Sequence, residues 1–169
     1  MNIQHGARAI KQSNAQFQTV EERMANSLQF AIVAPADLPA LAQALQEAGL
    51  PNDDVELPGR LFYAFQLEGQ HVGYAGFEVY GADALLRSVL IVPRQRKRGL
   101  GSQVVSEMEK LARQAGIESL HLLTTDQAPF FERIGYVLTQ RQLAPADIAS
   151  TLQFKSLCPS SASYLWKSL

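Results

Sequence analysis

One segment constrains the fold of this chain more than any other, because it joins a buried strand to a helix through a basic, glycine-rich loop. Residues 85–92 are almost all apolar, which predicts a central strand covered on both faces. Pro93 ends the strand, and four cations and two glycines follow between Arg94 and Gly101. Apolar residues then recur at helical spacing from Val104 to Ala112. This succession predicts an α/β (α+β) fold.

The loop has the composition of a phosphate-binding site. The start of a helix presents unpaired N–H groups and a positive dipole end, and glycines let an anion approach the backbone without meeting a Cβ. We therefore expect the loop to bind a pyrophosphate or another phosphate of a ligand. A solvated basic turn, whose glycines serve packing alone, is the alternative interpretation. The expected contacts are Arg96, Lys97, Arg98, Gly99, Leu100, Gly101 and Ser102.

Several other classes of function fit the sequence poorly. No Gly-Lys-Ser/Thr follows the loop, as a Walker motif requires, and the third glycine of a Rossmann fingerprint is absent. The formal net charge of −1 and the lack of aromatic residues among the loop cations argue against nucleic-acid binding. Cys158 is the single cysteine and the three histidines are scattered, so no disulfide within the chain and no metal site are expected.

The remaining sequence predicts a polar tail and further strands and helices around the central unit. Residues 1–27 form the predicted tail, in which 20–28 can make an amphipathic helix, and residues 28–169 form one domain. No run approaches the ~20 apolar residues of a membrane span and no secretory signal is recognisable, so a cytoplasmic protein without a membrane partner is expected. The predicted elements are strands at 28–33, 61–67, 72–79, 117–124 and 162–167 and from Tyr136 onward, helices from Asp37 to Ala48 and at 128–134 and 145–152, and an exposed loop at 50–59.

Two segments resemble the signature motifs of the GNAT acetyltransferase superfamily. Residues 96–101, RKRGLG, are similar to its Gln/Arg-x-x-Gly-x-Gly/Ala motif, and residues 128–136, APFFERIGY, resemble its Ala-x-x-Phe-Tyr-x-x-x-Gly-Phe segment. The resemblance covers about residues 28–169. It implies a mixed, mostly antiparallel sheet of about six to seven strands, splayed at its centre and flanked by helices. It also implies acetyl-CoA as cofactor and direct acetyl transfer to the amine of a small molecule.

The resemblance also implies where the reacting end of the cofactor lies. In a GNAT fold the pantetheine arm occupies the gap beside the central strand, whose free N–H groups polarise the thioester carbonyl. The expected cofactor contacts therefore extend to Leu90, Ile91 and Val92, of which Leu90 and Val92 are expected to make the backbone contacts, and, from the second motif, to Phe130 and Phe131. Phe131 stands where the family often has a proton-donating tyrosine, which leaves water or a hydroxyl such as that of Ser88 or Thr124 to assist the departing thiolate.

The sequence offers several candidates for the general base and does not select one of them. An alkyl amine with a pKa near ~10.4 must lose a proton before it attacks, and Arg87 and Ser88 occupy the stretch where many GNAT enzymes have a glutamate. The candidate bases are Asp53, Asp54, Glu56 and Glu78, with Asp54 the leading one, although Asp53 and Asp54 equally suit a cap or a turn. Arg87 is expected either to bind an acceptor carboxylate or to pair internally with a residue such as Glu78. The expected acceptor contacts are Asp53, Asp54, Arg87 and Thr124.

Three further segments, at 48–54, 85–89 and 154–162, look like the subgroup of acetyltransferases associated with arsenic-resistance operons. That resemblance implies an amino acid, or an arsenic- or phosphorus-containing analogue of one, as acceptor. A noncatalytic acyl-CoA-binding or sensing module is the alternative function, because the strand glutamate and the tyrosine are both missing. A homodimer formed through the C-terminal strands is expected by analogy with related folds.

Overall fold

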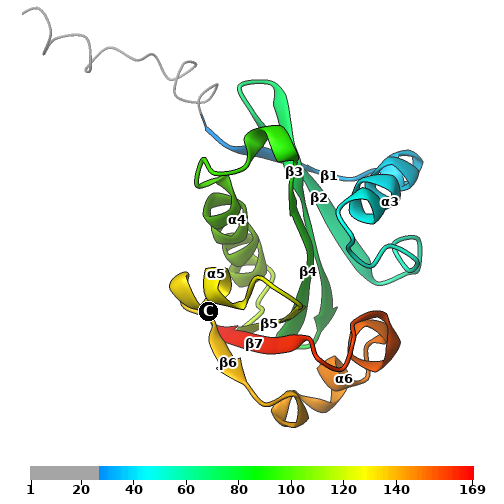
Figure 1. Ribbon diagram of the computed structural model, residues 1–169, viewed down its shortest axis with the longest axis vertical. Coiled ribbons are helices and arrows are strands. Elements are labelled where there is room, and N and C mark those ends of the chain that lie inside the picture. Colours follow the sequence, from blue (N-terminus) through cyan, green and yellow to red (C-terminus); the bar gives the residue numbers. More distant parts are fainter. Residues whose placement is uncertain (1–26) are drawn as a thin grey trace, which may run out of the picture.

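The computed structural model describes residues 27–169, which form a seven-stranded sheet with helices on both faces (Figure 1). The strand order is β1-β2-β3-β4-β5-β7-β6, and every neighbouring pair is antiparallel except β4 and β5. The predicted mixed, mostly antiparallel sheet is therefore confirmed. The strands are β1 Gln29–Ile32, β2 Arg60–Leu67, β3 Gln70–Tyr80, β4 Asp83–Ile91, β5 Ser119–Thr124, β6 Val137–Thr139 and β7 Ser163–Ser168; the helices are η1 Pro35–Asp37, α3 Leu38–Glu47, η2 Pro93–Gln95, α4 Leu100–Gln114, α5 Ala128–Arg133, η3 Arg141–Leu143, α6 Ala146–Ala149 and η4 Gln153–Leu157.

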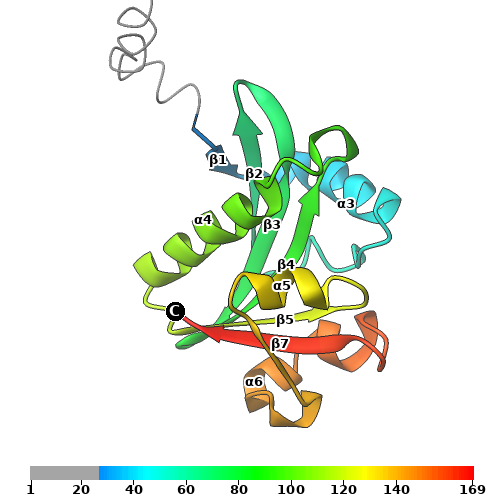
Figure 2. The same cartoon turned by 60° about the vertical axis from the view of Figure 1, so that its left-hand side comes forward.

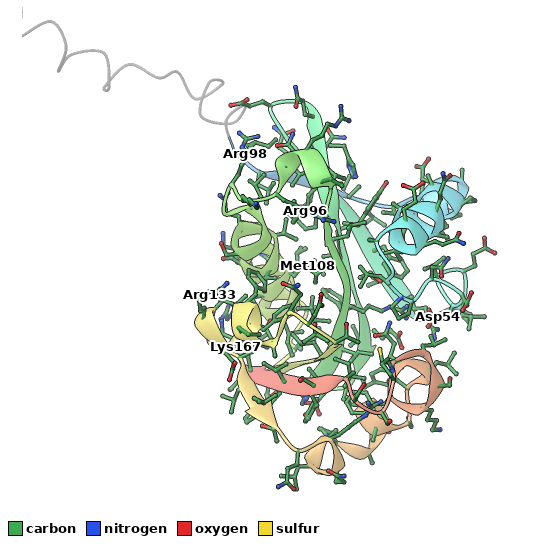
Figure 3. All side chains as sticks on the ribbon, in the orientation of Figure 1. Asp54, Arg96, Arg98, Met108, Arg133 and Lys167 are labelled. Atoms are coloured by element: carbon green, nitrogen blue, oxygen red, sulfur yellow. The ribbon has the colours of Figure 1, made fainter. Side chains whose placement is uncertain are left out.

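Helix α4 covers one face of the sheet and helix α3 covers the other. The apolar face of α4 is fully buried through Val104, Met108 and Ala112, as the helical spacing predicted (Figure 3). On the opposite face, Leu41 and Leu45 of α3 pack in a separate cluster. Because side chains alternate along a strand, β4 supplies both clusters. The strand is thus buried on both faces, as its nearly continuous apolar sequence predicted.

The sheet is splayed at its centre. The parallel contact between β4 and β5 consists of three residue pairs, from Asp83–Ser119 to Leu85–His121. Figure 2 shows β4 rising away from β5 and β7, which run across beneath it. Residues 86–91 of β4 consequently have no strand beside them on the β5 side, and the sequence-based expectation of a gap at this place is confirmed.

A β-bulge in β4 sits at the start of this gap. Tyr74 pairs with Leu90 but Gly76 pairs with Arg87, so two residues of β4, Ser88 and Val89, stand opposite one residue of β3. Ser88 has a φ of 56°, a conformation that costs a non-glycine residue about 1–2 kcal/mol. The bulge changes which residues face α3 and which face α4 from this point onward.

The C-terminal third differs from the sequence-based prediction. The helix expected over 145–152 is limited to α6, because Pro145 precedes it and the chain then enters the π-helical turn η4. Strand β6 has three residues rather than the longer strand expected from Tyr136. Asp37 does precede α3, but its side chain makes no capping hydrogen bond. The predicted tail helix over 20–28 lies almost entirely outside the described residues.

Within residues 27–169, no helix is both long enough and apolar enough to cross a membrane.

Candidate functional site

A cavity of about 680 Å³ opens where the end of β4 meets the glycine loop, the start of α4 and α5. The predicted phosphate loop and the second predicted motif are separated in the chain by α4 and β5. Both nevertheless line this cavity. The predicted cofactor contacts that line it are Leu90, Ile91, Arg96, Lys97, Gly99, Leu100, Gly101, Ser102, Phe130 and Phe131.

The first turn of α4 is arranged to receive an anion. Gly99 stands at the N-cap with a φ of 73°, and no side chain caps the helix. The hydroxyl of Ser102 donates to the carbonyl of Gly99 at 2.8 Å instead of accepting from a first-turn N–H group. A Cβ built on Gly99 would meet no atom within 4 Å, whereas one on Gly101 would lie 3.3 Å from the Phe130 ring. The exposed N–H groups and the open space beside Gly99 fit a phosphate group.

The loop cations divide into those that line the cavity and those that do not. Arg96 lines it, with its Nε donating to the carbonyl of Ile91 at 2.9 Å, and so does Lys97 (Figure 3 labels Arg96). Arg98, also an expected contact, instead hydrogen-bonds to Gln95 and is not part of the lining. Arg133 of α5 adds a third cation to the lining, against the single carboxylate of Asp126. The charge of the lining therefore suits an anionic ligand.

Both predicted backbone contacts, Leu90 and Val92, are wrong because of the strand register. The N–H group of Val92 donates to the carbonyl of Val72 in β3 at 2.9 Å, so it is not free for a ligand. Leu90 pairs with Tyr74 in the same register, and its side chain packs toward α3. Since peptide groups alternate along a strand, the N–H groups of Val89 and Ile91 face the gap instead. Ile91 is therefore the member of the expected set whose amide is correctly placed.

Some lining residues were not foreseen. Arg133 and Ile134 lie three and four residues after Phe130, and helical spacing from Phe130 would have indicated both. Ala48 and Leu50, by contrast, come from the end of α3, which no local signal connects to the loop. The unforeseen lining residues are Ala48, Leu50, Val89, Gln95, Asp126, Gln127, Arg133 and Ile134.

A second polar group, the buried ion cluster, surrounds Arg87 on the α3 side of the sheet. We use this name for Arg60, Arg87, Asp54, Glu78 and the residues bonded to them. The Arg87 guanidinium donates to both oxygens of Asp54, with 2.7 Å from Nη1 to Oδ2, and to Glu78. The Nε of Arg60 donates to Oδ2 of Asp54 at 3.0 Å. Two cations and two carboxylates thus neutralise one another, and the internal pairing of Arg87 with Glu78 is the alternative that the structure shows.

Two neutral side chains complete the cluster. With its amide oxygen turned toward Arg87, Gln153 accepts from Nη2 at 3.0 Å and from Nε at 3.2 Å. The hydroxyl of Tyr80 donates to Glu78 at 2.7 Å. All five N–H groups of the Arg87 side chain thereby face acceptors from three elements or loops, a degree of pairing that a buried charge requires.

This pairing makes Asp54 a poor general base. Burial alone would raise its pKa, but the hydrogen bonds and positive charges of Arg87 and then Arg60 outweigh burial and hold the pKa below its ordinary value. A carboxylate stabilised in this way has little tendency to take a proton from an amine. Asp54 and Glu78, both predicted as candidate bases, are instead the counter-ions of Arg87 and Arg60 in the described conformation.

The other predicted acceptor residues occupy separate places. Asp53 is exposed on the loop before β2. The hydroxyl of Thr124 accepts from the N–H group of Gln127 at 3.1 Å and so helps to form the turn into α5. Ser88 lies in the β-bulge, and its hydroxyl is buried without a hydrogen-bond partner among the described residues. An unpaired buried hydroxyl costs about 1–3 kcal/mol. Ser88 itself does not line the cavity of about 680 Å³, although the next residue, Val89, does.

No group of three or more His, Cys, Asp or Glu within residues 27–169 could hold a metal ion.

Comparison with known proteins agrees with the geometry of this cavity. Residues 58–138 match the model of the acetyltransferase (GNAT) domain, a segment that holds β4, the glycine loop and α5. This segment, just under half of the chain, is thus similar to the GNAT acetyltransferase domain. Protein YyaT of Bacillus subtilis (strain 168), itself uncharacterised, is 30% identical over 91 residues, which are 53% of this chain and 62% of YyaT. The chain thus spans about three-fifths of the length of that relative.

Solved GNAT structures show the same fold at low sequence identity. N-acetylglutamate synthase from Neisseria gonorrhoeae, solved with coenzyme A and N-acetyl-glutamate, gives a TM-score of 0.69 at 17% identity over 85% of this chain and 35% of the synthase. PaiA N-acetyltransferase from Thermoplasma acidophilum, solved with coenzyme A, gives a TM-score of 0.62 at 15% identity over 85% of this chain and 99% of PaiA. The likeness extends beyond residues 58–138 to most of the described fold.

Proposed function

We propose that this GNAT domain transfers the acetyl group of acetyl-CoA directly to the amine of a small molecule. The observation that carries the proposal is the cavity of about 680 Å³ at the splayed edge of β4, with an uncapped helix start, two glycines and three cations in its wall. The coenzyme would supply the activated thioester. The chain would supply the diphosphate site at Gly99 to Ser102 and the peptide N–H groups of Val89 and Ile91 beside the acyl end.

Proximity would account for much of the rate acceleration. Holding an amine and a thioester in one cavity can replace several kcal/mol of entropic cost, even where the acid–base groups are weak. Ser88 adjoins Val89 in the β-bulge, and its hydroxyl lacks a hydrogen-bond partner among the described residues. This free hydroxyl is the observation that supports a role for Ser88 in assisting the departing thiolate. The paired carboxylates of the buried ion cluster leave water as the carrier of the amine proton.

The finer proposal concerns the acceptor, for which we favour an amino acid or its arsenic- or phosphorus-containing analogue. Two of the three segments that resemble the arsenic-associated subgroup supply Asp54 and Arg87, which are hydrogen-bonded in the buried ion cluster. The third segment follows directly after Gln153, the first residue of η4, which also bonds to Arg87. The cluster would then fix the loop at 50–59 and η4 as the two walls of the acceptor site. The likeness to a synthase solved with N-acetyl-glutamate supports an amino-acid acceptor.

The decisive experiment is a thiol-release assay with acetyl-CoA across amino acids, glutamate analogues, polyamines and peptides, with a phosphorus-containing glutamate analogue added to the panel. An N-acetyltransferase releases thiol with at least one class of amine. The alternative, a noncatalytic acyl-CoA-binding module, binds acetyl-CoA by calorimetry but releases no thiol with any acceptor. Absence of coenzyme A binding would contradict both.

A matched pair of loop variants tests the cavity assignment itself. Lys97 lines the cavity, whereas Arg94 is exposed in the same loop and does not. Lys97→Gln removes a charge-assisted contact, so the Kd of coenzyme A should rise about tenfold or more. Arg94→Gln removes the same charge and should change the Kd by less than about threefold. Equal effects of the two substitutions would indicate a diffuse electrostatic attraction rather than a phosphate site.

A further inference from the structure

A second cavity, of about 370 Å³, lies at the other end of β4 and shares no lining residue with the first. Its walls come from the starts of β4 and β5, from β6 and β7, and from the segment between β6 and α6, the lower part of the view in Figure 2. The proposed acetyl transfer uses none of these groups. The lining residues are Asp83, Ser119, His121, Thr139, Leu143, Pro145, Tyr164 and Trp166.

The strand register gathers the polar groups of this cavity on one face. Asp83 of β4 pairs with Ser119 of β5, and His121 pairs with Trp166 of β7. Because side chains alternate along a strand, residues two apart share a face, so His121 stands with Ser119 and Tyr164 stands with Trp166. Four strands thus contribute to one wall, which makes the cavity a built part of the sheet rather than a hollow between mobile loops.

A hydrogen-bonded chain fixes one carboxylate in this wall. The Tyr164 hydroxyl lies 2.7 Å from Nδ1 of His121, and Nε2 of His121 lies 3.0 Å from Oδ1 of Asp83. A neutral histidine with its proton on Nε2 satisfies both contacts, since it donates to the carboxylate and accepts from the hydroxyl. The His121 ring also stacks on Tyr164 and on Trp166, with centroids 6.0 and 6.3 Å apart. Asp83 is therefore held in place through Oδ1.

The second carboxylate oxygen of Asp83, Oδ2, can bind a ligand. Its side chain is 33% exposed, and no hydrogen bond from the described residues reaches Oδ2. No lysine or arginine lines the cavity, so with a neutral His121 the lining carries one negative charge. The remaining surface is the indole of Trp166, the apolar Leu143 and Pro145, and two hydroxyls. A partly exposed carboxylate beside an aromatic ring and apolar walls is an arrangement that binds organic cations.

We propose that this second cavity binds a small organic cation, namely an ammonium or guanidinium group on a short apolar body. The cation pairs with Oδ2 of Asp83, and its apolar part packs against Trp166 and Leu143. The Tyr164–His121–Asp83 chain serves as a positioning device that keeps the carboxylate oriented toward the cavity. The two cavities then have opposite preferences, because the first is lined by cations and the second by a carboxylate.

The single tryptophan of the chain provides a direct test, since Trp166 lines this cavity. Purified protein is titrated with n-butylammonium and with agmatine, in the absence of acetyl-CoA, while tryptophan fluorescence is followed. We expect a saturable change with both cations and none with butyrate or 1-butanol. Asp83→Asn keeps an oxygen for His121 but removes the charge, and should weaken binding of both cations about tenfold or more.

Two further variants serve as a matched control and as a second, independent test of the binding site. Asp147→Asn removes an exposed carboxylate of α6 that does not line the cavity, and should leave the affinity unchanged. Leu143 is 68% exposed, so Leu143→Lys should fold normally and weaken binding by placing a competing ammonium at the rim, even if Asp83→Asn proves unstable. Unchanged affinity in Asp83→Asn or in Leu143→Lys, an equal response to butyrate, or no saturable response to either cation at millimolar concentration would overturn the proposal.

Discussion

The cofactor cavity and the buried ion cluster lie on neighbouring stretches of β4 and are built in contrasting ways. The anion-binding part of the cavity is built from residues that are consecutive in the chain, with the end of a strand, two glycines and a helix start between Ile91 and Ser102. The cluster joins Asp54 and Glu78 to an arginine that is 33 and 9 residues away. One region leaves its polar groups open to a ligand, whereas the other satisfies them internally.

The two regions of β4 therefore have different roles, one in ligand binding and the other in stability. Open N–H groups and exposed cations cost little in a solvated loop, and they contribute to binding only when an anion arrives. Buried charges must be paired at all times, because removing one partner leaves an uncompensated charge in the interior. Substitutions in the cluster should therefore act mainly on stability, and substitutions in the cavity mainly on ligand affinity.

The largest effect is expected from removing the central cation of the cluster. Arg87→Met leaves the buried carboxylates of Asp54 and Glu78 with Arg60 as their one remaining cation in the cluster, and should lower the free energy of unfolding by about 3–5 kcal/mol. Lys97→Met removes an exposed charge of the cofactor loop and should change the free energy of unfolding by less than about 0.5 kcal/mol. Urea unfolding of both variants measures the contrast, and similar stabilities would erase the proposed division between the two regions.

The next largest effect is expected in the pH dependence of the free energy of unfolding, to which the buried ion cluster contributes. The pKa of Asp54 is lower in the folded protein than its ordinary value of 3.8, so its stabilisation is complete above that value and is lost as pH falls through the lower folded pKa. The difference in unfolding free energy between the wild-type chain and Asp54→Asn should thus be constant near neutral pH and shrink below pH 3.8. Denaturant titrations of both chains across this range test the sign, and a difference that grows on acidification would be inconsistent with it.

In the cavity, a smaller loss of stability should accompany a specific loss of binding. Gly99→Ala forces a side chain into a φ of 73° and should cost about 1–2 kcal/mol, while its Cβ enters the space assigned to phosphate. The KM for acetyl-CoA should therefore rise about tenfold or more. Gly116→Ala, with a φ of 79° and equally open surroundings at the other end of α4, should cost similar stability without changing the KM. A KM that shifts equally in both variants would assign the effect to strain alone.

The smallest expected effect concerns the strained residue between the two regions. Ser88→Gly relieves a φ of 56° and removes an unpaired buried hydroxyl, so stability should stay level or rise by up to about 1 kcal/mol. The kcat of acetyl transfer should nevertheless fall if the hydroxyl assists the thiolate. Glu68→Gly relieves a similar φ of 52° in the turn between β2 and β3 and should leave the kcat unchanged. An unaltered kcat in Ser88→Gly would remove Ser88 from the mechanism.

The sequence predicted the fold class and the cofactor loop well because both leave short-range signals. Helical spacing in α4, the apolar run of β4 and the order of strands are all readable within windows of 10 to 18 residues or so. The fold class and the glycine loop needed no knowledge of how distant segments meet. The position of Phe130 and Phe131 was implied instead by the resemblance to the second GNAT motif, and both residues line the cavity.

The errors arose where distant segments decide the outcome. Whether Val92 or Ile91 presents a free N–H group depends on the pairing of β4 with β3 beyond the bulge at Ser88, and no local pattern specifies that register. The partner of Asp54 lies in another strand, so its loop sequence indicated a cap or a base equally well. The helix expected over 145–152 ends at Ala149, and the chain then enters η4, where Gln153 meets Arg87 in a contact between elements far apart in sequence.

The brief contact between β4 and β5 also divides the sheet mechanically. Strands β1 to β4 form one continuous half and β5 to β7 the other, and among residues 27–169 they are joined by a ladder of three residue pairs from Asp83 to Leu85. One hydrophobic core, with residues of β2, β4, α4, β5 and β7, packs across both halves. The width of the gap beside β4 is therefore fixed by side-chain packing rather than by main-chain hydrogen bonds.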